Sequence, residues 1–120
     1  MSITNLSAAD FETAIAKNSI VLVDFWASWC GPCRAFAPVF DRSAQSHPDV
    51  VHAKVDTEAQ QQLAAALEIQ SIPTIMAFRD GILVYRQPGA MPASALEDLV
   101  AGVKALDMNE VRAKLATATS

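Results

Sequence analysis

The order of hydrophobic and polar positions along this chain predicts its strands. Residues 20–26 are apolar at all but one position and begin with β-branched side chains, which predicts a central strand covered on both faces and parallel to a neighbour. In residues 51–56 apolar and polar side chains alternate, which predicts a second strand. Residues 74–78 predict a third strand, and the Asp-Gly turn signal beyond it predicts that residues 82–87 return antiparallel to it.

Helical spacing of apolar side chains predicts four helices around these strands. The first covers residues 7–17, and the second opens at the turn 29–33 and contains Pro38, which should kink it. A T-x-x-Q capping box predicts the third over residues 57–67, and the fourth is amphipathic up to Leu106. This order of elements predicts an α/β fold with one mixed sheet and helices on both faces.

Composition narrows the class of protein. The chain has 120 residues, 52% of them hydrophobic, which suits one domain that needs no metal or disulfide framework to fold. Nine basic and 13 acidic residues give a net charge of −4 with no basic block, which argues against nucleic-acid binding. The apolar stretches are too short to span a bilayer and no signal-peptide pattern is visible, so we expect a cytoplasmic protein without membrane contact.

The strongest chemical signal is the spacing of Cys30 and Cys33, the only cysteines. A secreted disulfide scaffold uses more cysteines, and a closed zinc site needs about four ligands, which His47 and His52 do not supply in a finger pattern. A lone C-x-x-C pair points first to redox chemistry. Spacing alone leaves open a coincidental pair of small buried side chains.

The residues around the pair carry a resemblance. The segment W-C-G-P-C at residues 29–33, which follows the strand V-D-F-W-A at the mouth of a helix, resembles the thioredoxin family. So do Pro38, the S-I-P-T segment at residues 71–74, the Asp-Gly turn, and P-G-A at residues 88–90. The resemblance covers about residues 5–106.

The resemblance implies a thioredoxin fold, with a central mixed sheet of four to five strands and helices on both faces. We expect a domain over residues 1–106 and a short C-terminal extension over residues 107–120, either a terminal helix or a frayed tail. The implied activity is that of a thiol-disulfide oxidoreductase that reduces protein disulfides. The Gly-Pro dipeptide between the cysteines is similar to that of the reducing family members.

The resemblance also implies how the protein is recharged. The dithiol is itself the redox group, so no cofactor or metal is bound, and reducing equivalents come from NADPH through thioredoxin reductase. The expected partners are this reductase and disulfide-containing client proteins, and the expected state is a monomer. Two alternatives remain: a disulfide isomerase or oxidase, and a non-catalytic binding module with the same fold.

Cys30 is the expected nucleophile, because free N–H groups and the positive end of a helix stabilise an anion there. Cys33 follows one helical turn later on the same face and is the expected resolving thiol, so that the Cys30–Cys33 disulfide is redox-active. Trp29, Gly31 and Pro32 complete the motif, and Pro32 suits a first helical turn. The alternative is a permanent structural disulfide, although a loop this short removes little chain entropy.

Asp24 is the second candidate, because a carboxylate in an apolar central strand is unfavourable unless it is protonated or partnered. The resemblance places it beneath the disulfide as proton acceptor and donor for Cys33; the alternative is a purely structural polar residue. Many thioredoxins have a lysine close to this aspartate on the neighbouring strand. Counting back from Asp56, that position is His52, with Lys54 two residues further along, so we expect proton transfer to be tuned differently here.

Pro73 resembles the family's cis-proline, and the alternative is a trans proline that begins a strand. A cis bond would place the backbone of Ile72 beside the cysteine pair, ready to bind an extended substrate segment. Trp29, Gly89 and Ala90 should complete a flat apolar rim for docking proteins.

Overall fold

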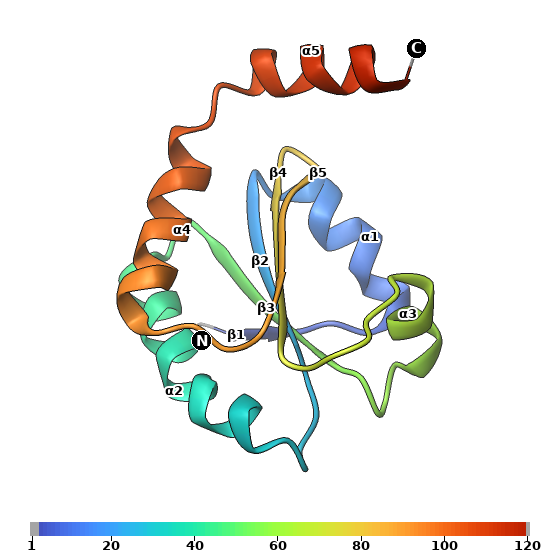
Figure 1. The fold of residues 1–120 in the computed structure, drawn as a ribbon, viewed down its shortest axis with the longest axis vertical. Helices are drawn as coiled ribbons and strands as arrows, with labels where there is room; N and C mark the ends of the chain where they lie inside the picture. Colours follow the sequence, from blue (N-terminus) through green and yellow to red (C-terminus); the bar gives the residue numbers. More distant parts are fainter. Residues whose placement is uncertain (1–2, 120) are drawn as a thin grey trace.

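The centre of the molecule is a five-stranded mixed sheet with the strand order β1-β3-β2-β4-β5 (Figure 1). The computed structural model describes residues 3–119. The strands are β1 (Ile3–Asn5), β2 (Ile20–Trp26), β3 (Val51–Asp56), β4 (Thr74–Arg79) and β5 (Ile82–Pro88). β3 runs parallel to both β1 and β2, whereas β4 is antiparallel to β2 and β5 is antiparallel to β4. The predicted mixed sheet is confirmed.

β2 is central because it is apolar on both faces. Its first six residues are buried and Trp26 is half-buried. One neighbour, β3, is parallel as predicted, but the other, β4, is antiparallel. The edge strand β1 was not predicted, since three residues are too few to show a periodic pattern.

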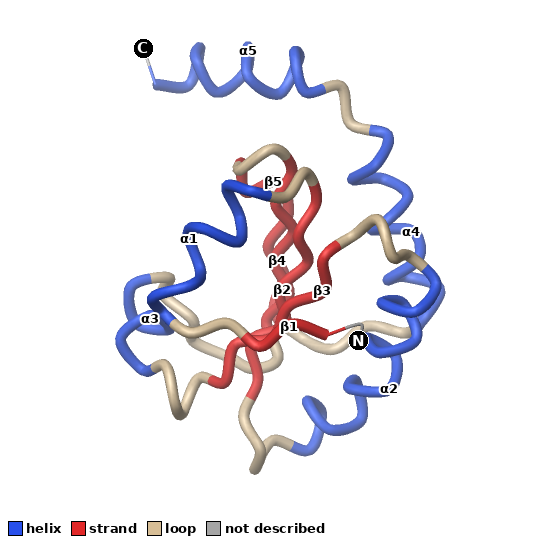
Figure 2. Tube along the Cα trace, turned by 180° about the vertical axis from the view of Figure 1, so that it is seen from behind, coloured by secondary structure: helices blue, strands red, loops and turns tan. Residues whose placement is uncertain are grey.

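Helices cover both faces of this sheet (Figure 1 and, from behind, Figure 2). The helices that cover the faces are α1 (Ala8–Lys17), α2 (Gly31–Ser46), α3 (Gln61–Ala66) and α4 (Ala93–Ala105), and a further helix, α5 (Met108–Thr119), follows them in the chain. Phe11 of α1 and Leu63 of α3 pack on one face, whereas Phe40 of α2 and Val100 of α4 pack on the other. Over residues 3–119, no helix has the length and apolar character needed to cross a membrane.

Helix α3 is shorter than the capping-box pattern predicted. The Thr57 hydroxyl donates to the Trp26 carbonyl at 3.0 Å, so it does not cap the helix. The Asp56 carboxylate instead accepts from the Glu58 N–H at 2.9 Å, within the turn that separates β3 from α3. The helix therefore begins only at Gln61.

Residues 108–119 form helix α5, so that of the two predicted states, a terminal helix or a frayed tail, the described part of this segment is a helix. The Asp107 carboxylate accepts from the Asn109 and Glu110 N–H groups at 3.0 and 3.2 Å and so caps the helix. Arg112 then pairs with Asp80 at the β4–β5 turn, at 3.3 Å. Helix α5 accordingly lies near that turn, beyond the end of the sheet (Figure 1).

Candidate active site

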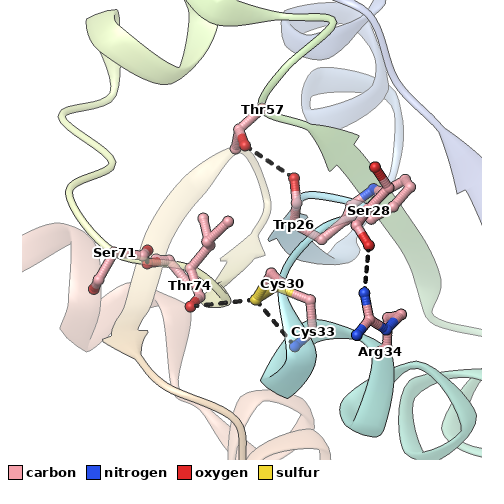
Figure 3. Close-up of a disulfide and its surroundings, with 9 residues drawn as sticks. Trp26, Ser28, Cys30, Cys33, Arg34, Thr57, Ser71 and Thr74 are labelled. Carbon is pink, nitrogen blue, oxygen red and sulfur yellow. Dashed lines mark hydrogen bonds between the residues drawn. A yellow bond between two sulfur atoms is a disulfide. The ribbon is translucent and has the colours of Figure 1, made fainter.

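The cysteine pair lies at the junction of β2 and α2. The chain leaves β2 at Trp26 and enters α2 at Gly31, with Cys30 as the N-cap residue. Cys30 and Cys33 form a disulfide (Figure 3), and they are only 4% and 1% exposed. The Cys33 N–H donates to Cys30 Sγ at 3.2 Å. Because this donor is one of the free N–H groups of the helix start, it favours negative charge on the Cys30 sulfur.

The other residues of the motif shape the turn around the pair. Pro32 lies in the first helical turn, where a missing N–H leaves no hydrogen bond unmade. Gly31 is exposed, and Trp29, at 65% exposed, presents an aromatic surface beside the disulfide. Arg34 was missed from the sequence: its Nη1 donates to the Ser28 carbonyl at 2.8 Å, across the turn (Figure 3). A charged residue directly after the cysteine motif could have been noticed in the sequence. Which carbonyl Arg34 binds could not, because that is set by the shape of the folded turn.

A second segment approaches the disulfide from the loop between α3 and β4. The Ile72–Pro73 peptide bond is cis, and the Ile72 carbonyl oxygen lies 3.7 Å from Cys30 Sγ. The Gly89 N–H donates to the Pro73 carbonyl at 2.7 Å, which brings the end of β5 to the same edge. Ala90 follows and is exposed. The structure thus brings Ile72, Pro73 and Gly89 to the side of the disulfide.

Asp24 lies inside the sheet, on the face that α2 covers. It shares this face of β2 with Ile20 and Leu22, which pack against α2, and Cys33 belongs to the buried face of the same helix. Asp24 is fully buried, and within the described residues neither of its carboxylate oxygens has a hydrogen-bond partner. Burial raises the pKa of Asp24 to about 7, with a smaller upward effect of Asp41.

The lysine neighbour of Asp24 is Lys54, which corrects the expectation placed on His52. In the pairing of β2 with β3, Asp24 lies opposite Lys54, and His52 lies opposite Leu22. The Lys54 charge lowers the pKa of Asp24 and so opposes the effect of burial. Counting along one strand gave the wrong partner, because the register between two strands sets which side chains face each other.

His52 has a structural role instead. It is fully buried, its Nε2 lies 2.9 Å from Ser43 Oγ and its Nδ1 lies 3.0 Å from the Val50 carbonyl oxygen. Its ring also packs edge-on against Phe40, with the centroids 5.1 Å apart. Burial lowers the pKa of His52, because removal from water disfavours the charged form of the ring.

Over the part of the chain that the structure describes, no three His, Cys, Asp or Glu side chains are close enough to hold a metal ion. Among the groups named above, the cysteine sulfurs are those that can exchange electrons.

Comparison with known proteins places this geometry in a family. The family model described as thioredoxin matches residues 2–102. A protein of Streptomyces coelicolor assigned as thioredoxin 2 is 48% identical over 115 residues, which cover 96% of this chain and 86% of that protein. Thioredoxin 1 of Synechococcus elongatus is 48% identical over 90 residues, which cover 73% of this chain and 84% of that protein.

A solved structure agrees with the sequence matches. A single-site mutant of a thioredoxin from Halobacterium salinarum superposes with a TM-score of 0.82 at 32% identity, over 88% of this chain and 94% of that one. The predicted thioredoxin fold is thereby confirmed. Since the family match runs through both cysteines and the whole sheet, the chain belongs to the thioredoxin family, with Cys30 and Cys33 as the redox pair of a protein-disulfide reductase.

Proposed function

We propose that Cys30 is the attacking thiol of this reductase, Cys33 the resolving thiol and Asp24 the proton acceptor. The observation that carries the proposal is the hydrogen bond at the start of α2, from the Cys33 N–H to Cys30 Sγ at 3.2 Å. In the reduced protein this N–H would stabilise a Cys30 thiolate, and the thiolate is the nucleophilic form of cysteine. Cys33, at 1% exposed, is the less accessible of the two sulfurs and therefore suits the second step.

Reduction of a client then proceeds by two exchanges. The Cys30 thiolate attacks one sulfur of the client disulfide; the client S–S bond breaks and the other client sulfur leaves as a thiolate. Cys33 gives its proton to Asp24 and attacks the Cys30 sulfur of the mixed disulfide. That bond breaks, the second client thiolate leaves and the Cys30–Cys33 disulfide forms, so one electron pair has passed to the client.

The environment of Asp24 supports its part in the second exchange. With a pKa of about 7, the carboxyl group can both accept and return a proton near neutral pH. It lies on the face of β2 that α2 covers, and Cys33 is on the buried side of that helix. A carboxyl group with an ordinary pKa would be a weaker base for a thiol proton.

Client proteins dock, in this proposal, on the surface around Trp29. The Trp29 side chain is 65% exposed, and Gly89 and Ala90 are exposed as well. The backbone of Ile72, whose carbonyl oxygen is 3.7 Å from Cys30 Sγ, would bind an extended client segment, with Pro73 fixing the turn.

The oxidised protein is recharged from NADPH through thioredoxin reductase, and it needs no bound cofactor because the dithiol carries the electrons. We further propose that it acts as a cytoplasmic monomer, that its partners are this reductase and disulfide-containing clients, and that residues 1–106 form the catalytic domain. Family membership supports a reductase and clients in general terms.

Insulin reduction tests the proposal against its alternatives. With NADPH and thioredoxin reductase, the wild type should turn over insulin disulfides, whereas Cys30→Ser and Cys33→Ser should not. A binding module would show no turnover in the wild type. An isomerase or oxidase would reactivate scrambled ribonuclease more efficiently than it reduces insulin, and either result would contradict the proposal.

A further inference from the structure

Two arginines of the β4–β5 hairpin each cap the C-terminal end of a helix. Arg79 of β4 donates from Nη1 to the Val103 and Lys104 carbonyls at 2.7 and 3.2 Å, at the end of α4. Arg86 of β5 donates from Nη1 and Nη2 to carbonyls at the end of α3, each at 2.7 Å. The last carbonyls of a helix lack intrahelical partners and carry partial negative charge, so a guanidinium group stabilises them.

The carbonyls that Arg86 binds belong to Leu67 and Glu68, where the chain leaves α3 for the active site. Glu68 has a φ of +55°, a left-handed conformation that a residue other than glycine rarely adopts. The Ile69 N–H closes the helix end on the Ala64 carbonyl at 3.0 Å. Arg86 therefore holds the chain at the point where its direction changes.

The segment that begins there ends beside the disulfide. From Ile69 the chain runs to Ile72, whose carbonyl oxygen is 3.7 Å from Cys30 Sγ. At its other end the Gly89 N–H, just after β5, donates to the Pro73 carbonyl at 2.7 Å. Residues 67–73 are thus bound at both of their own ends, at Leu67 and Glu68 by Arg86 of β5 and at Pro73 by Gly89, the residue after β5.

This segment also forms one wall of a surface hollow of about 190 Å³ beside the redox turn. Trp29 lines the hollow, and Gln70, Ser71 and Ile72 line it from the segment. Residues 69–72 thus contribute to the hollow and to the backbone beside Cys30, whereas the two cysteines belong to the N-cap and first turn of α2.

We propose that Arg86 is a positioning residue for client binding: it fixes residues 69–72 against β5 so that the Ile72 backbone is in place beside Cys30. The inference rests on the proposed client surface. Arg86 acts through the segment, because its two hydrogen bonds go to Leu67 and Glu68 and not to either sulfur. Its planar guanidinium group donates to the two carbonyls from two separate nitrogens held in a fixed fork, whereas a lysine offers a single ammonium nitrogen on a flexible stem.

The test compares Arg86→Met with Arg79→Met, a matched control that removes the same kind of cap from α4, and with Arg86→Lys. In Arg86→Met, amide hydrogen exchange at Ile69, whose N–H donates to the Ala64 carbonyl at 3.0 Å, should be at least about tenfold faster than in the wild type or in Arg79→Met, since two charge-assisted bonds are lost. Arg86→Met should raise the KM for insulin by about five- to tenfold with little change in kcat. Arg86→Lys should fall between wild type and Arg86→Met in both measurements.

Alkylation of reduced Cys30 by iodoacetamide should stay within about twofold of wild type in all three variants, because Arg86 does not touch the sulfur. Exchange at Ile69 that is equal in Arg86→Met and Arg79→Met would overturn the inference, and so would equal KM values for the two variants. Amide hydrogen exchange can be measured without any turnover. A wild type that fails to reduce insulin would therefore contradict the proposed function, whereas equal exchange in the two variants would contradict the inference about Arg86.

Discussion

Lys54 lies directly opposite Asp24 in the parallel pairing of β3 with β2, and its Nζ is 4.8 Å from the centre of the Trp26 ring. Burial raises the pKa of Asp24 and the Lys54 charge lowers it, and together with Asp41 they place it at about 7. A buried carboxyl group in an apolar strand thus keeps a protonation equilibrium near neutral pH. The pH dependence of client reduction should therefore follow the protonation of Asp24, which the Lys54 charge modifies.

The rate of client reduction should show an inflection near pH 7 that belongs to Asp24. Asp24→Asn should remove the inflection and slow single-turnover reduction at pH 7 by about 10- to 100-fold, since a general base is lost. Lys54→Gln should move the inflection to higher pH, because the charge that lowers the pKa of Asp24 is gone. Rates measured across neutral and mildly alkaline pH on wild type and both variants check this.

His52→Gln is the control for that experiment. His52 faces Leu22 rather than Asp24, so the variant should be less stable but keep the inflection of the wild type. If the inflection of the pH–rate profile moved in His52→Gln and stayed fixed in Lys54→Gln, the pairing of Asp24 with Lys54 would be contradicted.

Asp24→Asn should also stabilise the oxidised protein at high pH. The pKa of Asp24 is 3.8 when unfolded and about 7 when folded, so the folded state holds the proton longer and stability falls as pH rises between these values. Below about pH 4 the variant and wild type should be similar; above about pH 7 the variant should gain on the order of 4 kcal/mol in the free energy of unfolding. Urea unfolding below, between and above the two pKa values measures the difference. A gain that is the same in all three conditions would show that ionisation is not its cause.

Cys33→Ser should trap clients as mixed disulfides on Cys30. Without Cys33 no thiol within the described structure is placed to attack the Cys30 sulfur, so the intermediate persists. Non-reducing gels of cell extract should show adducts that dithiothreitol removes, and Cys30→Ser should show few. Equal trapping by both variants would reverse the two roles.

Removal of residues 107–120 should leave insulin reduction unchanged. Helix α5 pairs with Asp80, whose N–H binds the Ser19 carbonyl at the start of β2, whereas the disulfide lies beyond the other end of that strand. Loss of buried Met108 and of the Arg112–Asp80 pair should lower the free energy of unfolding by about 1–3 kcal/mol. Chemical denaturation and the insulin assay on the truncated chain check both parts, and a several-fold loss of turnover at unchanged stability would give α5 a part in function.

The sequence by itself determined those features that depend on neighbours along the chain. A run that is apolar at all but one position made β2 a buried central strand, and W-C-G-P-C made a helix start with Cys30 at its N-cap, because strand burial and helix capping are set within a few residues. The strand β1 was too short to carry such a signal, although the family resemblance allowed a fifth strand.

Only the tertiary structure decided which distant groups meet. In the sequence Thr57 resembled a helix cap, but in the structure its hydroxyl donates to the carbonyl of Trp26, the last residue of β2. The partner of Asp24 followed from strand register, and the two carbonyls that Arg86 caps followed from the packing of β5 against the end of α3. Register and packing depend on how whole faces of the sheet are buried together, so no local pattern of residues specifies them.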